Sequence, residues 1–374
     1  MALSLLDGRI EVDEDLARVA FACTTCGLCD VSCKFIMEAE RQEVILALRE
    51  HIVAAGYGPK QHVAAVESLR RTGYAHGAPA AESLDWAEGL GLKRLPGEDA
   101  EVLLYTGASA YSDPNQAQTA RRLGELMLAA GLDVGVLEVE PDTGIDAFWT
   151  AHREAFETHA AKVCDILDGS GAKRIVVSSG SHLGLLRAYY PRYARAPRAE
   201  VLHASELLDE LLRKRRLRLP KSIERSVTYH DACYLGRQSE PPQPWEGEER
   251  RSHGVLTYFD PPKPINYGVR GVYEPPRRIL RQIPGLRLTE MHRIREYSFC
   301  CGGSGGVPDT HPEVARTAAE SRVEEARDVG ADAIVTACHY CIRNLQRWQG
   351  SGAMPILDLI DLVYEAAELQ GGAS

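Results

Sequence analysis

Two pairs of segments in this chain read almost as copies of each other, and this duplication constrains the fold more than any other feature. GAKRIVVSSGSHLGLL (171–186) aligns without gaps with GADAIVTACHYCIRNL (330–345). EVLLYTGA, which ends at Ala108, aligns in the same way with SVTYHDAC, which ends at Cys233. Each of the four contains an apolar run followed by a turn, the pattern of a buried strand. Gene duplication is the simplest explanation, so we expect two similar units.

Strands and helices alternate through both units. The first has strand patterns EVLLYTG, LDVGVLEV and KRIVVSS, with helical patterns over 115–130 and 146–168. The second has SVTYHDACYLGR, LRLTEM and ADAIVTAC, with helical patterns at PPRRILRQIPG, 311–329 and 339–348. Alternation of this kind is typical of α/β domains with largely parallel sheets. We therefore predict an α/β fold with two duplicated repeats, preceded by a small, mainly helical region: 1–75 helical region, 76–98 linker, 99–222 first repeat and 223–374 second repeat.

Composition excludes several classes of protein. The formal net charge of −10 argues against a nucleic-acid binder, which usually has a basic face. No run approaches 18 consecutive apolar residues, so we predict no membrane insertion. The N-terminus MALSLLDGRIEVDEDLARVA lacks the charged and apolar regions of a signal peptide. We expect a cytoplasmic protein, peripheral to the inner membrane only through a partner.

Nine of the ten cysteines fall into two groups. Clustered cysteines in a long intracellular chain are more often metal ligands than disulfides, because the cytosol keeps thiols reduced. The first group is CTTCGLCDVSC, a C-x2-C-x2-C-x3-C pattern whose close thiolates suit a [4Fe–4S] cube. A zinc knuckle is the alternative, although its usual spacing differs. The predicted ligands are Cys23, Cys26, Cys29 and Cys33.

Two details qualify this group. Lys34 follows Cys33, where bacterial ferredoxins have Pro and use the fourth cysteine for a second cluster. Either Cys33 therefore ligates its own cube, or the fourth ligand comes from elsewhere, including another subunit. The tenth cysteine, Cys164, lies on an apolar helical face and is interpreted as a buried small side chain.

The second group lies in the second repeat, directly after predicted strands or in the loops before helices. The carboxyl ends of parallel strands are where open α/β sheets build their sites, so these five thiols are expected to converge. They are Cys233, Cys300, Cys301, Cys338 and Cys341.

The motifs YHDACYLGR, YSFCCGGSGG and GADAIVTACHYC resemble the signature of the CCG (cysteine-rich) domain family, which includes the B-type and D-type subunits of heterodisulfide reductase. The N-terminal motif resembles the ferredoxin-type motif commonly fused to it. The resemblance is strong over 226–374 and extends to 99–222 by fold only. It implies a noncubane [4Fe–4S] cluster with five cysteine ligands, one of which bridges two irons. Carried over by motif, these ligands are Cys233, Cys300, Cys301, Cys338 and Cys341.

Other residues near the second group are assigned supporting roles. Gly302, Gly303 and Gly305 would let the backbone approach the cluster and donate N–H bonds to sulfur; a flexible loop is the alternative. His230 and His339 are candidates to deliver protons beside the catalytic pair Cys300 and Cys301 as a disulfide accepts electrons, or are structural hydrogen-bonding residues.

Two features depart from the family pattern. The segment 239–268 is longer than expected, and is interpreted as a lid, a docking loop or a surface insertion. The first repeat has Ala108, Ser179 and His182 where the second has cysteines, so it cannot hold a cluster with these residues. We interpret it as a scaffold or a partner interface, with His182 on the surface or in the core.

These observations favour an iron–sulfur redox subunit of a heterodisulfide-reductase-like complex, with an N-terminal [4Fe–4S] cluster relaying electrons to a C-terminal one that reduces a disulfide or passes electrons on. A pure electron-transfer subunit of a dehydrogenase or quinone-linked complex and a structural zinc module are the alternatives. No glycine-rich dinucleotide fingerprint follows a strand, so we expect no flavin or NAD on this chain. A flavoprotein or dehydrogenase partner in a hetero-oligomer would then supply electrons.

Overall fold

The computed structural model describes residues 1–37, 40–77, 84–253, 256–349 and 353–369. The N-terminal region is helical. Its elements are α1 (Ala2–Leu6), α2 (Glu14–Phe21), α3 (Leu28–Met37), α4 (Arg41–Ala54) and α5 (Lys60–Thr72).

The first repeat follows. Its elements are η1 (Asp85–Ala87), β1 (Lys93–Leu95), β2 (Val102–Tyr105), α6 (Ser109–Ser112), α7 (Pro114–Ala129), β3 (Val134–Leu137), α8 (Ile145–Trp149), α9 (Arg153–Gly169), β4 (Arg174–Val177), α10 (Gly180–Gly184), the π-helical η2 (Leu185–Tyr189), α11 (Tyr190–Tyr193), β5 (Glu200–His203) and α12 (Ala204–Arg213).

The second repeat has the same alternation, interrupted by a hairpin. Its elements are β6 (Arg225–Tyr229), β7 (Glu248–Ser252), β8 (Leu256–Asp260), α13 (Glu274–Gln282), β9 (Leu286–Leu288), η3 (Arg295–Tyr297), α14 (Val307–Thr310), α15 (Pro312–Asp328), β10 (Ala333–Thr336), α16 (His339–Arg347), β11 (Ile356–Asp358) and α17 (Leu359–Ala366).

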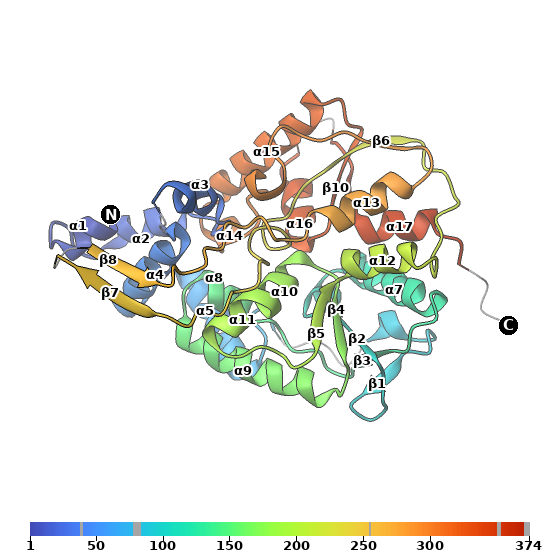
Figure 1. The fold of residues 1–374 in the computed structure, drawn as a ribbon, viewed down its shortest axis with the longest axis horizontal. Coiled ribbons are helices and arrows are strands. Elements are labelled where there is room, and N and C mark those ends of the chain that lie inside the picture. The colour runs from blue at the N-terminus through green and yellow to red at the C-terminus, as the bar shows by residue number, and fades with distance from the viewer. Residues whose placement is uncertain (38–39, 78–83, 254–255, 350–352, 370–374) are drawn as a thin grey trace.

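The sheets confirm the predicted α/β class and its duplication. The strand orders are β1-β3-β2-β4-β5 and β11-β10-β6-β9, and neighbouring strands in both sheets are parallel (Figure 1). Strands β2, β3, β4 and β5 correspond in chain order to β6, β9, β10 and β11. Without β1, the two sheets therefore have one and the same order.

The repeats meet through their helices and through the carboxyl ends of their strands. Helix α12 packs against α13, and α7 packs against α17. Arg278 of α13 and Asp209 of α12 form an ion pair at 2.7 Å across the first of these helix contacts. The N–H of Gly180, after β4, donates to the carbonyl of Ala337, after β10, at 2.9 Å. The site-building edges of the two sheets therefore face each other.

Two local predictions differ from the structure. Residues 93–95 lie in the predicted linker but form β1, an edge strand that pairs with β3 because Leu95 is buried against the sheet; residues 78–83 of the linker lie outside the described residues. The predicted helix 146–168 is broken into α8 and α9 at Ala151, whose φ of 59° is left-handed. A left-handed residue cannot continue an α-helix.

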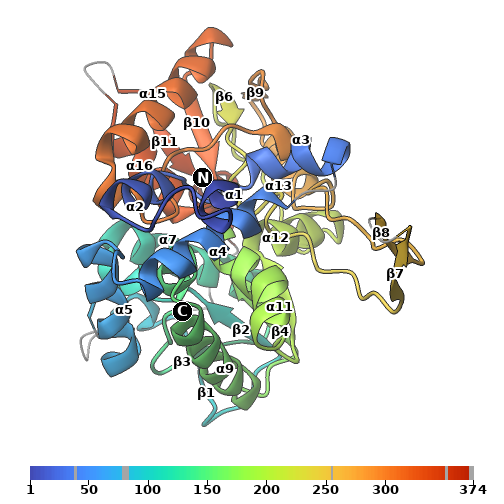
Figure 2. The same ribbon diagram turned by 90° about the vertical axis from the view of Figure 1, so that its left-hand side faces the viewer.

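The N-terminal helices lie across the junction of the two repeats (Figure 2). Helix α2 begins at Asp13, whose carboxylate accepts the Leu16 N–H at 2.7 Å. Helices α2 and α4 share a small core that includes Phe21 and Ile52, separate from the large core of the repeats. The antiparallel β7–β8 hairpin, from the segment 239–268, stands away from the body of the molecule in the same view.

Candidate iron–sulfur centre

The five cysteines of the second repeat converge, and all are buried. Cys233 follows β6, Cys338 is the N-cap residue of α16 and Cys341 lies in its first turn. Cys300 and Cys301 are in the loop before α14. The sulfurs of Cys301 and Cys341 are 3.2 Å apart.

These thiols perturb one another strongly. Hydrogen bonds from Cys300 and Cys341 hold the pKa of Cys301 well below its usual range. A hydrogen bond from Cys341 lowers the pKa of Cys338 to about 6. Burial raises the pKa of Cys233, and the neighbouring cysteines raise it further. Packing five thiols this closely leaves too much negative charge for all to ionise without a cation.

The predicted glycines serve two purposes. The N–H of Gly302 donates to the sulfur of Cys300 at 3.2 Å, and that of Gly303 to Cys301 at 3.4 Å. A Cβ on Gly303 would lie 2.6 Å from the Tyr340 carbonyl oxygen. A Cβ on Gly305 would lie 2.7 Å from the carbonyl oxygen of Cys23. The glycines thus allow N–H contacts to sulfur and also close packing of the N-terminal cysteine loop.

The N-terminal cysteine group packs directly on this loop, a proximity that the sequence did not predict. The hydroxyl of Ser304 donates to the carbonyl of Thr24 at 2.6 Å. A side-chain hydrogen bond with Cys300 raises the pKa of Cys26, so these two thiols are in contact. The two cysteine groups therefore form one continuous site.

The N-terminal cysteines are close enough to perturb one another's ionisation. Cys29 and Cys33 are on the first two turns of α3. Burial and, to a lesser extent, the charges of Asp30, Cys26, Cys23 and Cys33 raise the pKa of Cys29 to about 11. Cys29 is exposed, whereas Cys26 is partly buried. This arrangement is compatible with Cys33 as a ligand of the same cube, and it leaves the Cys29 side open to solvent.

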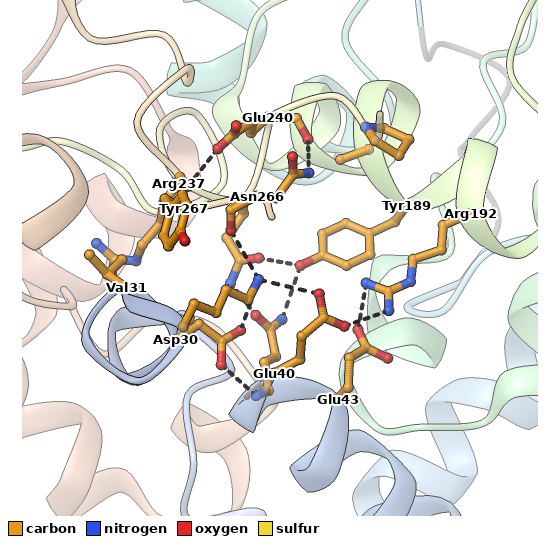
Figure 3. A pocket seen from close by; sticks show the side chains of 17 residues that line it. Asp30, Val31, Glu40, Glu43, Tyr189, Arg192, Arg237, Glu240, Asn266 and Tyr267 are labelled. Atoms are coloured by element: carbon orange, nitrogen blue, oxygen red, sulfur yellow. Dashed lines mark hydrogen bonds and ion pairs between the residues drawn. The ribbon is translucent and has the colours of Figure 1, made fainter. Parts of the chain in front are cut away.

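A polar crevice of 80 Å3 lies beside the N-terminal cysteine loop, and hydrogen bonds among its lining residues hold that loop in place (Figure 3). Gln238 donates to the side-chain oxygen of Gln42 at 2.7 Å, and Gln42 donates to the Tyr189 hydroxyl at 3.1 Å. A Cβ on Gly27 would lie 2.5 Å from the Gln238 amide nitrogen. Lys34 donates to the carbonyl of Asn266 at 3.1 Å, which ties α3 to the base of the 239–268 segment. These contacts hold the N-terminal group against both repeats.

Two buried arginines flank the joint cysteine site, and neither pairs with a carboxylate of the described residues. Arg49 donates to the carbonyls of Cys23 at 2.5 Å and Gly305 at 3.1 Å. Arg237 donates to the carbonyl of Cys26 at 2.6 Å, and its Nη2 has no partner in the described part of the chain. Burying a cation without a counter-charge is costly.

Burial alone would lower the pKa of Arg237, and ionised cysteines beside it would supply the counter-charge that raises it overall. Cys26, Cys233 and Cys300 each raise the pKa of Arg237 through their charge. Soft thiolates in this number and proximity match the ligands of iron–sulfur clusters, which carry net negative charge. The residues present therefore fit such a group. The sequence signal for Arg49 was its place on the apolar stripe of α4 with Leu46 and Ile52, where a charged residue is unexpected.

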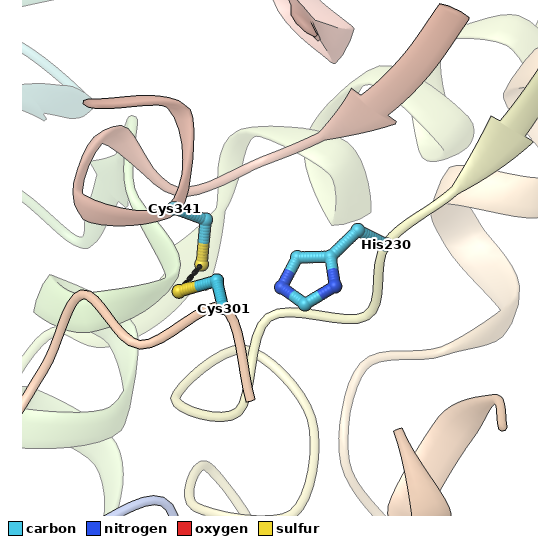
Figure 4. Close-up of side chains that lie close together, drawn as sticks. All are labelled: His230, Cys301 and Cys341. Atoms are coloured by element: carbon cyan, nitrogen blue, oxygen red, sulfur yellow. Dashed lines mark hydrogen bonds between the residues drawn. The ribbon is translucent and has the colours of Figure 1, made fainter. Parts of the chain in front are cut away.

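His230 faces the sulfurs of Cys301 and Cys341, and its ring nitrogen and both sulfurs lie within 4.8 Å of one another (Figure 4). Its Nδ1 lies 3.0 Å from the Nε of Arg322, which donates to it. Burial and the charge of Arg322 lower its pKa to about 3. The ring is therefore neutral, with its proton on Nε2, which makes no hydrogen bond to any described residue. Proton delivery and a structural hydrogen-bonding role, the two interpretations from the sequence, both stay predictions.

His339 is the first residue of α16, next to Cys338. Its Nδ1 is 2.9 Å from the Ser179 hydroxyl of the first repeat, and burial lowers its pKa well below its usual value. Its ring is 5.4 Å from that of His182, which is buried in the core, one of the two places that the sequence left open for it. Cys164 is buried in α9, and its thiol donates to the Arg195 carbonyl at 3.3 Å.

Comparisons with known proteins agree with these motifs. The cysteine-rich domain family CCG matches residues 256–346. The chain is 28% identical over 363 residues to the D-type subunit of the dihydromethanophenazine:CoB–CoM heterodisulfide reductase of Methanosarcina acetivorans, a match that covers 93% of this chain and 78% of that protein. It is 27% identical over 374 residues to the probable iron-sulfur-binding oxidoreductase FadF of Bacillus subtilis. That match covers 97% of this chain and 47% of FadF, so the chain spans about half the length of that relative.

Among solved structures, a hypothetical protein from Helicobacter pylori has a TM-score of 0.50 with this chain at 11% identity. The superposition covers 88% of this chain and 59% of that one, and it bears on the fold alone. Within the described residues, no helix is long and apolar enough to cross a membrane.

Proposed function

We propose that this chain is an iron–sulfur redox subunit with two [4Fe–4S] clusters, because it carries a CCG cysteine-rich domain and is related to a heterodisulfide reductase and other iron–sulfur oxidoreductases. Electrons enter at the N-terminal group and reach the C-terminal group, where a disulfide is reduced or the electrons are passed on. The observation that carries this proposal is the direct packing of the two cysteine loops, in which Ser304 donates to the Thr24 carbonyl and Arg49 donates to the carbonyls of both Cys23 and Gly305.

The proposed ligands are the nine clustered cysteines. Cys23, Cys26, Cys29 and Cys33 would hold a ferredoxin-type cluster, and Cys233, Cys300, Cys301, Cys338 and Cys341 a second one of noncubane type. Clusters bound there would supply one-electron redox chemistry.

Other residues affect the charge of this site and the side from which a partner can reach it. Arg49 and Arg237 offset negative charge at the thiolates, which favours electron uptake. Gly302 and Gly303 donate N–H bonds to the sulfurs of Cys300 and Cys301, and the neutral ring of His230 lies near those of Cys301 and Cys341. The exposed Cys29 marks the side on which a flavoprotein or dehydrogenase partner would deliver electrons.

Metal analysis of the anaerobically purified protein tests the proposal. We expect about eight irons per chain and broad absorption near 400 nm, both typical of two [4Fe–4S] clusters. A protein with about four irons and one zinc would refute the second cluster and favour the structural zinc module. Cys164→Ser is the matched control, because this thiol lies outside both groups and its loss should leave the iron content unchanged.

Pure electron transfer is a second candidate, favoured by the cysteine-free edge of the first repeat at Ala108, Ser179 and His182. Paramagnetic resonance of the oxidised protein, with and without a small thiol, separates the two. A thiol-dependent signal that disappears in Cys301→Ser supports a substrate-binding cluster. An unchanged signal with thiols and disulfides supports relay alone.

A further inference from the structure

A cavity of 540 Å3 lies between the repeats, next to the C-terminal cysteines. Gly303, His339 and Tyr340 form the wall that separates it from Cys301, Cys338 and Cys341. The remaining walls come from the first repeat, from the segment after α5 and from residues of the second repeat that include Asp309 and Arg343. Both repeats and the N-terminal region thus enclose it.

This cavity occupies the edge of the first sheet that corresponds to the cysteine site of the second. Ala108, the repeat equivalent of Cys233, lines it, and so does His182, the equivalent of Cys341. Asp146 and Trp149 come from the loop and short helix between β3 and α9, as Cys300 and Cys301 come from the segment between β9 and α15. At the equivalent edge of the sheet, the second repeat has cysteine thiols and the first repeat has a cavity.

The lining is acidic and aromatic. Four carboxylates line the cavity, with the guanidinium of Arg343 and the imidazoles of His76, His182 and His339. Asp146 lies 3.4 Å from His76, and that contact raises the His76 pKa. The rings of Trp149 and Tyr340 are 4.8 Å apart on one wall. The four carboxylates are Asp113, Asp142, Asp146 and Asp309.

A buried polar atom also faces this space without a partner. His182 is 3% exposed, and its Nδ1 makes no hydrogen bond to any described residue. Burial lowers its pKa to about 4, so the imidazole is neutral. A buried nitrogen without a hydrogen bond is costly unless a ligand or water satisfies it.

We propose that this cavity binds a small thiol or disulfide that carries an ammonium group, and that it discriminates against anionic thiols. The carboxylates attract the ammonium group. A sulfonate, phosphate or carboxylate would face like charges in a partly enclosed space. The identification of a thiol rests on the proposed function, since the cavity shares a wall with the cysteine site; the charge preference rests on the cavity alone.

Calorimetric titration with three disulfides of equal length tests the charge preference. The probes are cystamine, the disulfide of 2-mercaptoethanol and the disulfide of 2-mercaptoethanesulfonate, used with the anaerobically purified protein. We expect cystamine to bind at least tenfold more tightly than the sulfonate, with the neutral compound between them. Sulfonate binding as tight as that of cystamine would overturn the proposal, and so would the absence of cystamine binding.

Two carboxylate variants locate the binding. Asp146→Asn should weaken cystamine about tenfold, the usual effect of losing one charged partner in a partly buried site. Asp309→Asn, at an exposed position of the lining, should weaken it less and carries little risk to folding. Asp165→Asn is the control, because Asp165 lies on α9, outside the lining of the cavity, and pairs with Arg195. Equal cystamine affinity in all three variants and the wild type would place the binding elsewhere and refute the assignment.

The iron content of the same samples separates this inference from the proposed function. Charge-selective binding to a protein that holds zinc would retain the cavity assignment and refute the redox role. A full complement of iron without charge-selective binding would do the reverse.

Discussion

The two repeats share a strand order, but they differ in charge at the ends of the equivalent strands β2 and β6. In the first repeat, Thr106 donates its N–H at 2.9 Å and its hydroxyl at 2.7 Å to Glu140. No cation of the described residues pairs with that buried carboxyl. In the second repeat, the equivalent residue Asp231 pairs with Arg277 at 2.7 Å. One backbone position thus supports a neutral hydrogen-bonded pair in one repeat and an ion pair in the other.

The two repeats therefore keep the same strand order although the residues at the carboxyl ends of their strands differ in charge. The second repeat has buried thiols and an ion pair at its edge, whereas the first has the neutral Thr106–Glu140 pair and a cavity with acidic side chains in its lining. Loss of cysteines from one repeat therefore need not have disturbed the packing of β2 and β4, which pair along four residues.

The largest expected effect is on the iron content, and it distinguishes a thiol of the second repeat from one of the first. Cys301→Ser should remove about four irons per chain, because this sulfur contacts Cys341 at the centre of the site. Iron analysis and absorption near 400 nm provide the measurement. Cys164→Ser, in the first repeat, should retain the full complement. Equal iron contents in both variants would show that the second repeat holds no cluster.

A second test uses the buried carboxyl of the first repeat. Burial raises the pKa of Glu140 to about 8, above its ordinary value of 4.5. As pH rises from 4.5 to 8, the unfolded chain ionises first, so the folded protein loses stability across this window. Wild type should lose about 4 kcal/mol more than Glu140→Gln between pH 5 and pH 8.

Denaturant titrations of both proteins at pH 5 and pH 8 measure this difference, and other titrating groups cancel because they are common to both. A pH dependence of stability that is the same in wild type and Glu140→Gln would show that this carboxyl ionises normally in the folded state.

A third pair of variants compares the two strand ends directly. Asp231→Asn leaves Arg277 with only the half-exposed Glu290, and should cost about 3 kcal/mol of unfolding free energy. Thr106→Val, at the equivalent position, removes one neutral hydrogen bond and should cost about 1 kcal/mol. Urea unfolding of both variants measures the costs. A Thr106→Val cost as large as that of Asp231→Asn would contradict the distinction between the repeats.

The sequence predicted the repeats and the convergence of the five thiols because both depend on local patterns. Apolar runs locate β2, β4, β6 and β10, and parallel strands bring their carboxyl ends to one edge. Short strands such as β1 were missed, because three residues carry little periodicity.

Contacts between distant segments could not be predicted in this way. Cys26 and Cys300 meet because the N-terminal loop packs on glycines of the second repeat, and no spacing within either motif encodes that contact. The burial of Arg237 between Cys26 and Cys233 could not be predicted either, because it depends on three segments brought together by the fold.

The smallest expected effect concerns that arginine. Arg237→Gln removes a buried positive charge beside the thiolates of the second repeat, which makes electron uptake less favourable. The midpoint potential of the C-terminal cluster should fall by about 50–100 mV, since 59 mV corresponds to a tenfold change for one electron. Arg237→Lys keeps the charge and should shift the potential less. Arg278→Gln, whose guanidinium pairs with Asp209 at the repeat interface, should leave it unchanged. Equal shifts in Arg237→Gln and Arg278→Gln would mean that distance from the thiolates is irrelevant, and Arg237 would then have no special role in the charge of this site.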